Sequence, residues 1–301
     1  MLLLPVVRIR FCSFLLTYLI YSRLCPCAFA YGRSRDELQR SGCRESVSIS
    51  CSDILTENLQ VNLSWKLSLV LKDLAPPSLL TSYNAERLPV IAQMLHATTA
   101  LYTHTVAKEK AADVTEQKTE DENASGWYRW RNNALEMYGV NYRHSDIVLE
   151  ERDTTPQDAE DLLAHVYSGY EGLGTLHAGD RAPEAPGLIP YGTDRETSLL
   201  TLFKPSLHSV LVFLAEDDNV DGLASRYPKD AVQTFIISRK DLGPVEGGIG
   251  LVDREGHAYN AYLVEEGVTT IVVVRPDTFI GAIVKDTAGV DRYFSKILKF
   301  S

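Results

Sequence analysis

Apolar positions in the first part of the chain follow a helical spacing. Between residues 59 and 74 they form one stripe, made up of Leu59, Leu63, Leu67, Val70, Leu71 and Leu74. Every odd position from 59 to 71 is also apolar, which would suit a strand. Strands are usually about 3–10 residues long, so we predict a helix. Pro76 and Pro77 predict where it ends, because proline cannot continue a hydrogen-bonded helix.

A second apolar stripe predicts a helix over residues 78–106. Its face comprises Leu79, Leu80, Tyr83, Leu88, Ile91, Leu95 and Tyr102. Pro89 lies inside this range and predicts a kink. Residues 107–126 are rich in acidic side chains and poor in large apolar ones, which is typical of a solvated linker. Residues 127–178 regain aromatic side chains, and we interpret them as a connecting segment.

The last part of the chain, residues 179–301, alternates short β-rich runs with amphipathic stretches, which predicts one α/β domain. We expect strands at 209–214, 232–238, 270–275 and 278–284, and helices at 219–227, 259–264 and 290–298. This order of strand, helix, strand, helix, hairpin and helix is thioredoxin-like. The predicted fold class is therefore α/β, with a thioredoxin-like C-terminal domain preceded by a helical segment at 52–106.

Charge and cysteine are concentrated unevenly. The net charge is −10, but residues 1–51 hold seven arginines and three acidic residues, for +4, which leaves −14 for the remainder. A body this acidic repels phosphate backbones, so we expect no nucleic-acid partner. All five cysteines also fall in the first 51 residues, and no Cys/His set has the spacing of a zinc site. We therefore predict no metal site.

The N-terminal leader, residues 1–51, has some features of a secretory signal. Arg8 and Arg10 precede an apolar run at 11–20, and Ala28-Phe29-Ala30 resembles a small-residue cleavage site. The apolar run is shorter than the roughly 20 residues that a membrane span needs, so membrane insertion is not expected. The leader is either a secretory signal or a misassigned reading frame, and the glycosylation sequons at Asn62 and Asn123 do not decide between them.

The predicted thioredoxin-like domain has no thiol where thiol chemistry takes place. Such a domain needs a cysteine of low pKa at its first helix, commonly in Cys-x-x-Cys. The corresponding residues, 215–219, read Ala-Glu-Asp-Asp-Asn. We infer that the domain is structural or interactive.

Three sets of residues together carry a family resemblance. Residues 62–67 (Asn-Leu-Ser-Trp-Lys-Leu), with 77–80 (Pro-Ser-Leu-Leu) and 83–89 (Tyr-Asn-Ala-Glu-Arg-Leu-Pro), resemble the helix pair that closes the FAD domain of phenol 2-monooxygenase and its relatives. Residues 179–183 (Gly-Asp-Arg-Ala-Pro) resemble the start of that family's C-terminal domain. Val-Arg-Pro-Asp, followed by Phe-Ile-Gly, resembles its closing hairpin.

The resemblance implies a cofactor, a reaction and a partner. In that family, FAD reacts with NAD(P)H and oxygen and transfers one oxygen atom to a phenolic ring, while the protein orients the cofactor. The C-terminal domain is associated with subunit contacts, so the resemblance implies a homodimer or another protein partner. It also implies a cytoplasmic location, with secretion as the alternative if the leader is genuine.

The glycine-rich half of that family is missing from the sequence. No Gly-x-Gly-x-x-Gly occurs in the 301 residues, and Gly169, Gly172 and Gly174 do not fit this fingerprint. We therefore carry over no catalytic residue. Asn62 is the one cofactor-binding candidate, as the last polar residue of the flavin motif, and a helix cap is the simpler interpretation.

Two arginines also have a functional and a structural interpretation. Arg87, beside Glu86 on the predicted helix, would contact a cofactor pyrophosphate or form a surface or interdomain ion pair, and we favour the ion pair. Arg275 would be an active group or a turn residue paired with Asp277, and we favour the turn.

Two functions of different classes follow. The first is a truncated FAD-dependent monooxygenase that is inactive alone, with the helical end of the FAD domain at 52–106 and the dimerisation-type domain at 179–301. The second is a non-catalytic dimerisation or protein-binding module with a redox-dead thioredoxin-like fold. The sequence gives neither the aromatic substrate nor the choice of NADH or NADPH.

Overall fold

The computed structural model describes residues 51–112, 139–152, 158–166, 175–215, 222–240, 243, 245–265 and 267–299. Our predictions for the leader at 1–50, for the linker beyond residue 112 and for Gly169, Gly172 and Gly174 lie outside the described residues. Residues Glu57–Ser301 form one compact unit. In the part of the chain that is described, no helix is both long enough and apolar enough to cross a membrane.

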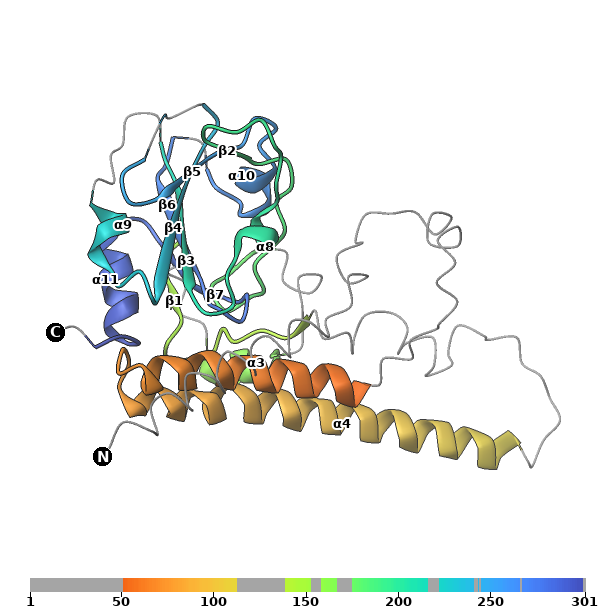
Figure 1. Ribbon diagram of the computed structural model, residues 1–301. Helices are drawn as coiled ribbons and strands as arrows, with labels where there is room; N and C mark the ends of the chain where they lie inside the picture. The colour runs from red at the N-terminus through yellow and green to blue at the C-terminus, as the bar shows by residue number, and fades with distance from the viewer. Residues whose placement is uncertain are drawn as a thin grey trace, which may run out of the picture. The chain divides into compact units, whose positions relative to one another are not determined.

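Two long helices run side by side in the first part of this unit (Figure 1). They are α3 (Cys51–Leu71) and α4 (Thr81–Ala112), joined by the short 3-10 helix η2 (Pro77–Leu80). At the end of α3, Asp73 adopts a left-handed backbone with φ 59°, and the N–H of Leu74 donates to the carbonyl of Leu69 at 2.9 Å. This closing turn redirects the chain, and the two prolines that follow prevent the helix from resuming.

Pro89 lies inside α4 without ending it. Proline has no N–H, so the carbonyl of Ala85, four residues earlier, loses its helical donor. Nε2 of His144 lies 3.1 Å from that carbonyl oxygen and supplies the missing hydrogen bond. Since a carbonyl can only accept, Nε2 must carry the proton. The connecting segment therefore supports the helix at its weakest point.

A seven-stranded sheet forms the centre of the C-terminal domain (Figure 1). Its strands, in chain order, are β1 (Leu149–Glu150), β2 (Ile189–Pro190), β3 (His208–Phe213), β4 (Val232–Ser238), β5 (Ile249–Val252), β6 (Thr270–Val274) and β7 (Ile280–Val284). In space they follow the order β1-β7-β6-β3-β4-β5-β2. β3 is parallel to β4 and antiparallel to β6, and β6 forms an antiparallel hairpin with β7. This arrangement confirms the predicted mixed α/β, thioredoxin-like class.

Helices cover both faces of the sheet. α9 (Leu223–Arg226) and α11 (Thr287–Ser295) lie on one face, and α8 (Leu199–Leu202) and α10 (His257–Ala261) lie on the other (Figure 1). α6 (Ala159–Ala164) belongs to the connecting segment. Alternate residues of β3 divide between the two resulting cores: Val210 and Val212 face the first, while Leu211 and Phe213 face the second. Trp65 and Leu69 of α3 join the first core, so the helix pair packs on the domain.

Sequence periodicity predicted the main strands correctly and the buried face of the first helix incorrectly. The four expected strands are present, and the three expected helices appear in shortened or shifted form as α9, α10 and α11. β5 was missed because Gly247 and Gly248 precede it and its first residue, Ile249, is exposed. The predicted apolar face of the first helix was wrong. Leu63, Leu67 and Leu71 are exposed, and the same helix buries Asn62, Trp65, Lys66 and Leu69.

His208 is fully buried at the start of β3, and neither of its ring nitrogens has a hydrogen-bond partner. Its ring packs edge-on against Trp65 at 5.2 Å and Phe294 at 5.5 Å, measured between ring centroids. Burial, together with the positive charge of Arg275, lowers the pKa of His208 from 6.5 to about 3. The folded protein therefore holds a neutral imidazole in an aromatic core.

We expect His208 to make the fold sensitive to acid. Below pH 6.5 the unfolded chain binds a proton at this position, while the folded chain does not until about pH 3, so stability falls as the pH drops through this range. The loss has a limiting slope of about 1.4 kcal/mol per pH unit. His208→Phe should flatten the dependence of the free energy of unfolding on pH, measured by urea unfolding between pH 7 and 4. His96→Gln, at an exposed position of α4, is the control, and an equal slope in wild type and His208→Phe would refute the assignment.

Candidate functional site

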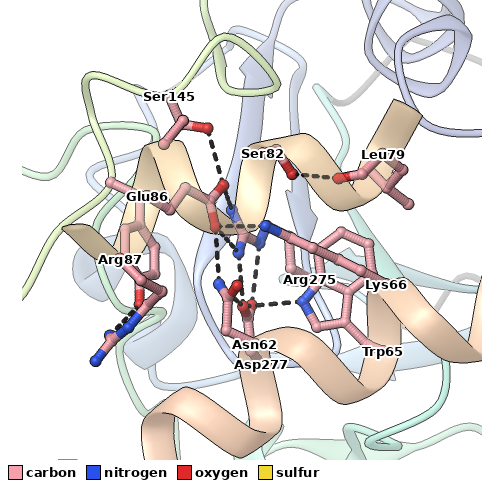
Figure 2. A network of polar contacts seen from close by, with 12 residues as sticks. Asn62, Trp65, Lys66, Leu79, Ser82, Glu86, Arg87, Ser145, Arg275 and Asp277 are labelled. Carbon is pink, nitrogen blue, oxygen red and sulfur yellow. Dashed lines mark hydrogen bonds and ion pairs between the residues drawn. The ribbon is translucent and has the colours of Figure 1, made fainter. Parts of the chain in front are cut away.

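Four charged side chains are buried together where the helix pair meets the turn between β6 and β7 (Figure 2). Lys66 comes from α3, Glu86 from α4, and Arg275 and Asp277 from the turn. Their exposed fractions are 0%, 0%, 2% and 7%. Two positive and two negative charges make the cluster neutral as a whole, which is the condition under which buried charges are tolerated.

Glu86 and Arg275 form a two-pronged ion pair. Nη1 of Arg275 donates to Oε1 of Glu86 at 2.8 Å, and Nη2 donates to Oε2 at 3.0 Å. Glu86 also accepts from Nζ of Lys66 at 2.8 Å and from the hydroxyl of Ser145 at 2.8 Å. Bidentate guanidinium–carboxylate pairs are among the strongest hydrogen-bonded contacts in proteins. This pair joins positions 189 residues apart in the sequence.

Asp277 joins the hairpin turn to α3. Its Oδ1 accepts from Nε of Arg275 at 3.0 Å, and its Oδ2 accepts from Nη2 at 2.6 Å. The same Oδ2 accepts from the indole N–H of Trp65 at 3.0 Å and from Nδ2 of Asn62 at 3.1 Å. Within the turn, the N–H of Thr278 donates to the carbonyl of Arg275 at 3.0 Å, which holds both charged residues in place.

The electrostatics of the cluster keep Glu86 ionised. Burial opposes the charge on Glu86, but the positive charges of Arg275 and Lys66 outweigh it and lower the pKa of Glu86 far below its usual range. Burial lowers the pKa of Lys66 from 10.5 to about 8, and the charge of Glu86 limits that fall. Burial also works against the charge of Arg275, yet Asp277 and Glu86 raise its pKa above the usual value. Lys66, Glu86 and Arg275 are therefore charged at neutral pH.

Aromatic rings enclose the guanidinium of Arg275. Its Cζ lies 5.1 Å from the ring centroid of Trp65 and 5.3 Å from that of Tyr142. Cations are attracted to the faces of such rings, and the rings exclude water, which strengthens the ion pairs. The cluster is thus a dry, fully paired arrangement.

Asn62, the predicted cofactor-binding residue, lies in the middle of α3, so its interpretation as a helix cap was wrong. Its exposed fraction is 1%, and its Nδ2 donates to Oε2 of Glu86 at 2.7 Å as well as to Asp277. Its Oδ1 has no hydrogen-bond partner in the structure. The role of Asn62 at a flavin edge stays a prediction.

The arginines were assigned correctly in one case and wrongly in the other. The pairing of Arg275 with Asp277 is confirmed, although its second carboxylate partner, Glu86, was not predicted. The surface or interdomain ion pair expected for Arg87 is not found among the described residues. Arg87 is 1% exposed, and its Nη1 donates to the hydroxyl of Tyr142 at 2.7 Å, while its Nε and Nη2 have no partner.

Lys66 and Trp65 were missed as members of this site. The signal for Lys66 was present in the sequence, because it is the one basic residue of positions 51–71 and lies between two apolar residues, Trp65 and Leu67. A single sequence could not show which carboxylate it would meet. Lys66 pairs with Glu86, 20 residues later on the neighbouring helix.

The cluster is suited to holding segments together and not to group transfer. Each of its two acids contacts a cation, and each of its two cations has a carboxylate partner. The described residues contain no group of three or more His, Cys, Asp or Glu that could hold a metal ion. Burial raises the pKa of Tyr142 to about 12, so its hydroxyl is neutral at neutral pH.

Two family models match the segments that supply the cluster residues of the helix pair and of the β6–β7 turn. Residues 60–98 match the model of a FAD binding domain, and residues 250–301 match that of the phenol hydroxylase C-terminal dimerisation domain. Asn62, Lys66 and Glu86 fall in the first match, and Arg275 and Asp277 fall in the second. The buried ion pairs therefore cross from one family module to the other.

Solved structures share the fold of the chain. The flavin-dependent monooxygenase PieE, in complex with FAD and substrate, aligns with a TM-score of 0.54 and 21% identity over 80% of this chain and 44% of its own. Aklavinone-11 hydroxylase, in a ternary complex with FAD and aklavinone, aligns with a TM-score of 0.53 and 20% identity over 81% of this chain and 40% of its own. The chain thus spans less than half the length of either protein.

A search of curated proteins found no match. The two family matches nevertheless occur in the order that the sequence motifs predicted, and the fold shared with PieE covers 80% of the chain. The predicted resemblance is confirmed: the chain resembles the C-terminal portion of phenol hydroxylase-like, FAD-dependent aromatic hydroxylases.

Proposed function

We propose that this chain supplies the end of a FAD-binding domain and the dimerisation domain of an aromatic hydroxylase, and that alone it does not hydroxylate a substrate. The observation that carries the proposal is the buried bidentate pair of Glu86 and Arg275, which joins the two family modules. In such an enzyme, FAD supplies the oxygen-transfer chemistry and NAD(P)H the reducing equivalents. This chain would hold its helix pair and its dimerisation domain in a fixed arrangement.

The residues present fit only the edge of a flavin site. Asn62 is the last polar residue of the flavin motif, and both of its amide hydrogen bonds go to carboxylates of the cluster. Only its buried Oδ1 lacks a partner. The dinucleotide in this class of protein is held by a glycine-rich turn between a strand and a helix, and the sequence has no Gly-x-Gly-x-x-Gly. We therefore assign no catalytic step to the residues of this chain.

Purified chain, incubated with excess FAD and then passed through a desalting column, is expected to retain no stoichiometric flavin absorbance. The reason is the missing glycine-rich loop, without which no backbone N–H cradle exists for the pyrophosphate. PieE, whose structure holds FAD, serves as the positive control for retention through the same column. One equivalent of FAD bound by the purified chain would overturn this part of the proposal.

Removal of one partner from the buried cluster is expected to destabilise the whole unit. Glu86→Gln leaves Lys66 and part of Arg275 without a carboxylate, which should cost about 3–5 kcal/mol of unfolding free energy. The double variant Glu86→Gln/Lys66→Met removes the stranded ammonium and leaves Arg275 paired with Asp277, so it should lose less. Urea unfolding followed by circular dichroism measures both.

Asp73→Asn is the matched control for the same acid-to-amide change. Its carboxylate is 86% exposed and contacts Lys299 at the surface, so the change should alter the unfolding free energy by less than about 1 kcal/mol. A double variant no more stable than Glu86→Gln alone would show that the charges are not coupled in the way the structure indicates.

The second candidate function is a non-catalytic dimerisation module. It is favoured by the dimerisation-domain match and by the chain's lack of cysteine beyond residue 51, which leaves the thioredoxin-like fold without a thiol. Sedimentation of the chain without flavin tests it. A stable dimer that binds no FAD would support this function, and a monomer at micromolar concentration would exclude it.

A further inference from the structure

The match to a dimerisation domain raises the question of which surface pairs. Among the described residues, two large hydrophobic side chains within the matched range are exposed: Leu263 at 48% and Val268 at 45%. Both lie in the loop that leads from α10 to β6. Single exposed apolar residues are common on protein surfaces, so exposure alone does not assign a role to them.

The backbone at Leu263 gives a second, independent observation. The N–H of Leu263 donates to the carbonyl of Asn260 at 3.2 Å, and the N–H of Val264 donates to the carbonyl of Tyr259 at 2.9 Å. These two bonds form the Schellman motif that ends many helices. Its left-handed position is occupied here by leucine with φ 51°, although glycine or asparagine is usual there. Local folding alone would not select an exposed leucine at this position.

The loop is held firmly on both sides of Leu263. The preceding side chain, Tyr262, is fully buried, and its hydroxyl donates to the carbonyl of Pro183 at 3.2 Å. Arg152 donates from Nη1 to the carbonyl of Tyr262 at 3.0 Å. After the loop, Oγ1 of Thr269 accepts from the N–H of Ala215 at 3.0 Å. A rigidly held apolar side chain loses little conformational entropy when it binds a partner.

Charged side chains of both signs accompany this apolar loop and the helix before it. Glu265 is exposed within the loop, and Arg239 is exposed just after β4. Arg239 stands beside α10, since its Cζ lies 4.9 Å from the ring centroid of Tyr259. A two-fold dimer brings the same patch from each copy together, so a patch of mixed sign is complementary to itself.

We propose that Leu263 and Val268, in the loop between α10 and β6, form a dimer contact by packing against a second copy of this chain. The inference rests on the proposed dimerisation function. The loop lies next to Ala215, whose N–H donates to Thr269. A redox-active thioredoxin-like domain would carry its thiol in the segment that begins near Ala215, and this chain has no cysteine there. In this proposal the surface serves for pairing instead.

Leu263→Asn removes the apolar side chain without straining the fold, because asparagine adopts a left-handed backbone more readily than leucine. A loss of dimerisation in this variant therefore reports on binding. The full chain and its variants Leu263→Asn and Val268→Ser are compared by sedimentation velocity over a range of concentrations. Each variant should raise the dimer dissociation constant at least about tenfold. Circular dichroism of the diluted proteins should show that the fold of both variants is unchanged.

Asp73→Asn is the matched control, because Asp73 occupies the same left-handed position at the end of α3. It should leave the dissociation constant unchanged. A wild-type chain that stays monomeric would overturn the dimerisation function itself. A wild-type dimer unaffected by either loop variant would leave dimerisation standing and overturn the assignment of this surface.

Discussion

Glu86 and Arg275 are ionised side chains without access to water, and each is stable in the fold only because the other is present. Taking either charge out of water costs several kcal/mol, and the cost is offset only if the two lie in bidentate contact. Their positions on α4 and on the β6–β7 turn therefore cannot vary independently. Lys66, Asp277 and the indole of Trp65 extend the same constraint to α3.

This constraint explains where sequence reasoning succeeded and where it failed. The β3, β4, β6 and β7 strands could be predicted because each contains a short run of apolar residues that is buried in the sheet. The orientation of α3 could not, since the helix buries Asn62 and Lys66 and exposes Leu63 and Leu67. Periodicity assumes that apolar side chains face inward, and that assumption fails where buried polar groups find partners inside, as the amide nitrogen of Asn62 and the ammonium of Lys66 do.

The candidate site was predictable only in part. The local pairing of Arg275 with Asp277 follows from a separation of two residues across a turn, which one sequence can reveal. The contacts to Glu86 and Asn62 span 189 and 215 residues, and only the folded chain brings them together. The contact of Arg87 could not be predicted from the sequence either. Its neighbour Glu86 binds Arg275 and Lys66, and the partner of Arg87 is Tyr142, in the connecting segment.

Pro89 has a consequence for how this protein can vary. A proline inside α4 is compatible with an uninterrupted helix because His144 donates to the carbonyl that the proline leaves vacant. The two positions are therefore expected to coevolve. A relative that replaces Pro89 is free to lose the donor at 144, whereas one that keeps the proline must retain a side chain able to reach the carbonyl of residue 85. The residue at position 144 of the connecting segment is thus constrained by a proline in α4, a helix that precedes this segment in the chain.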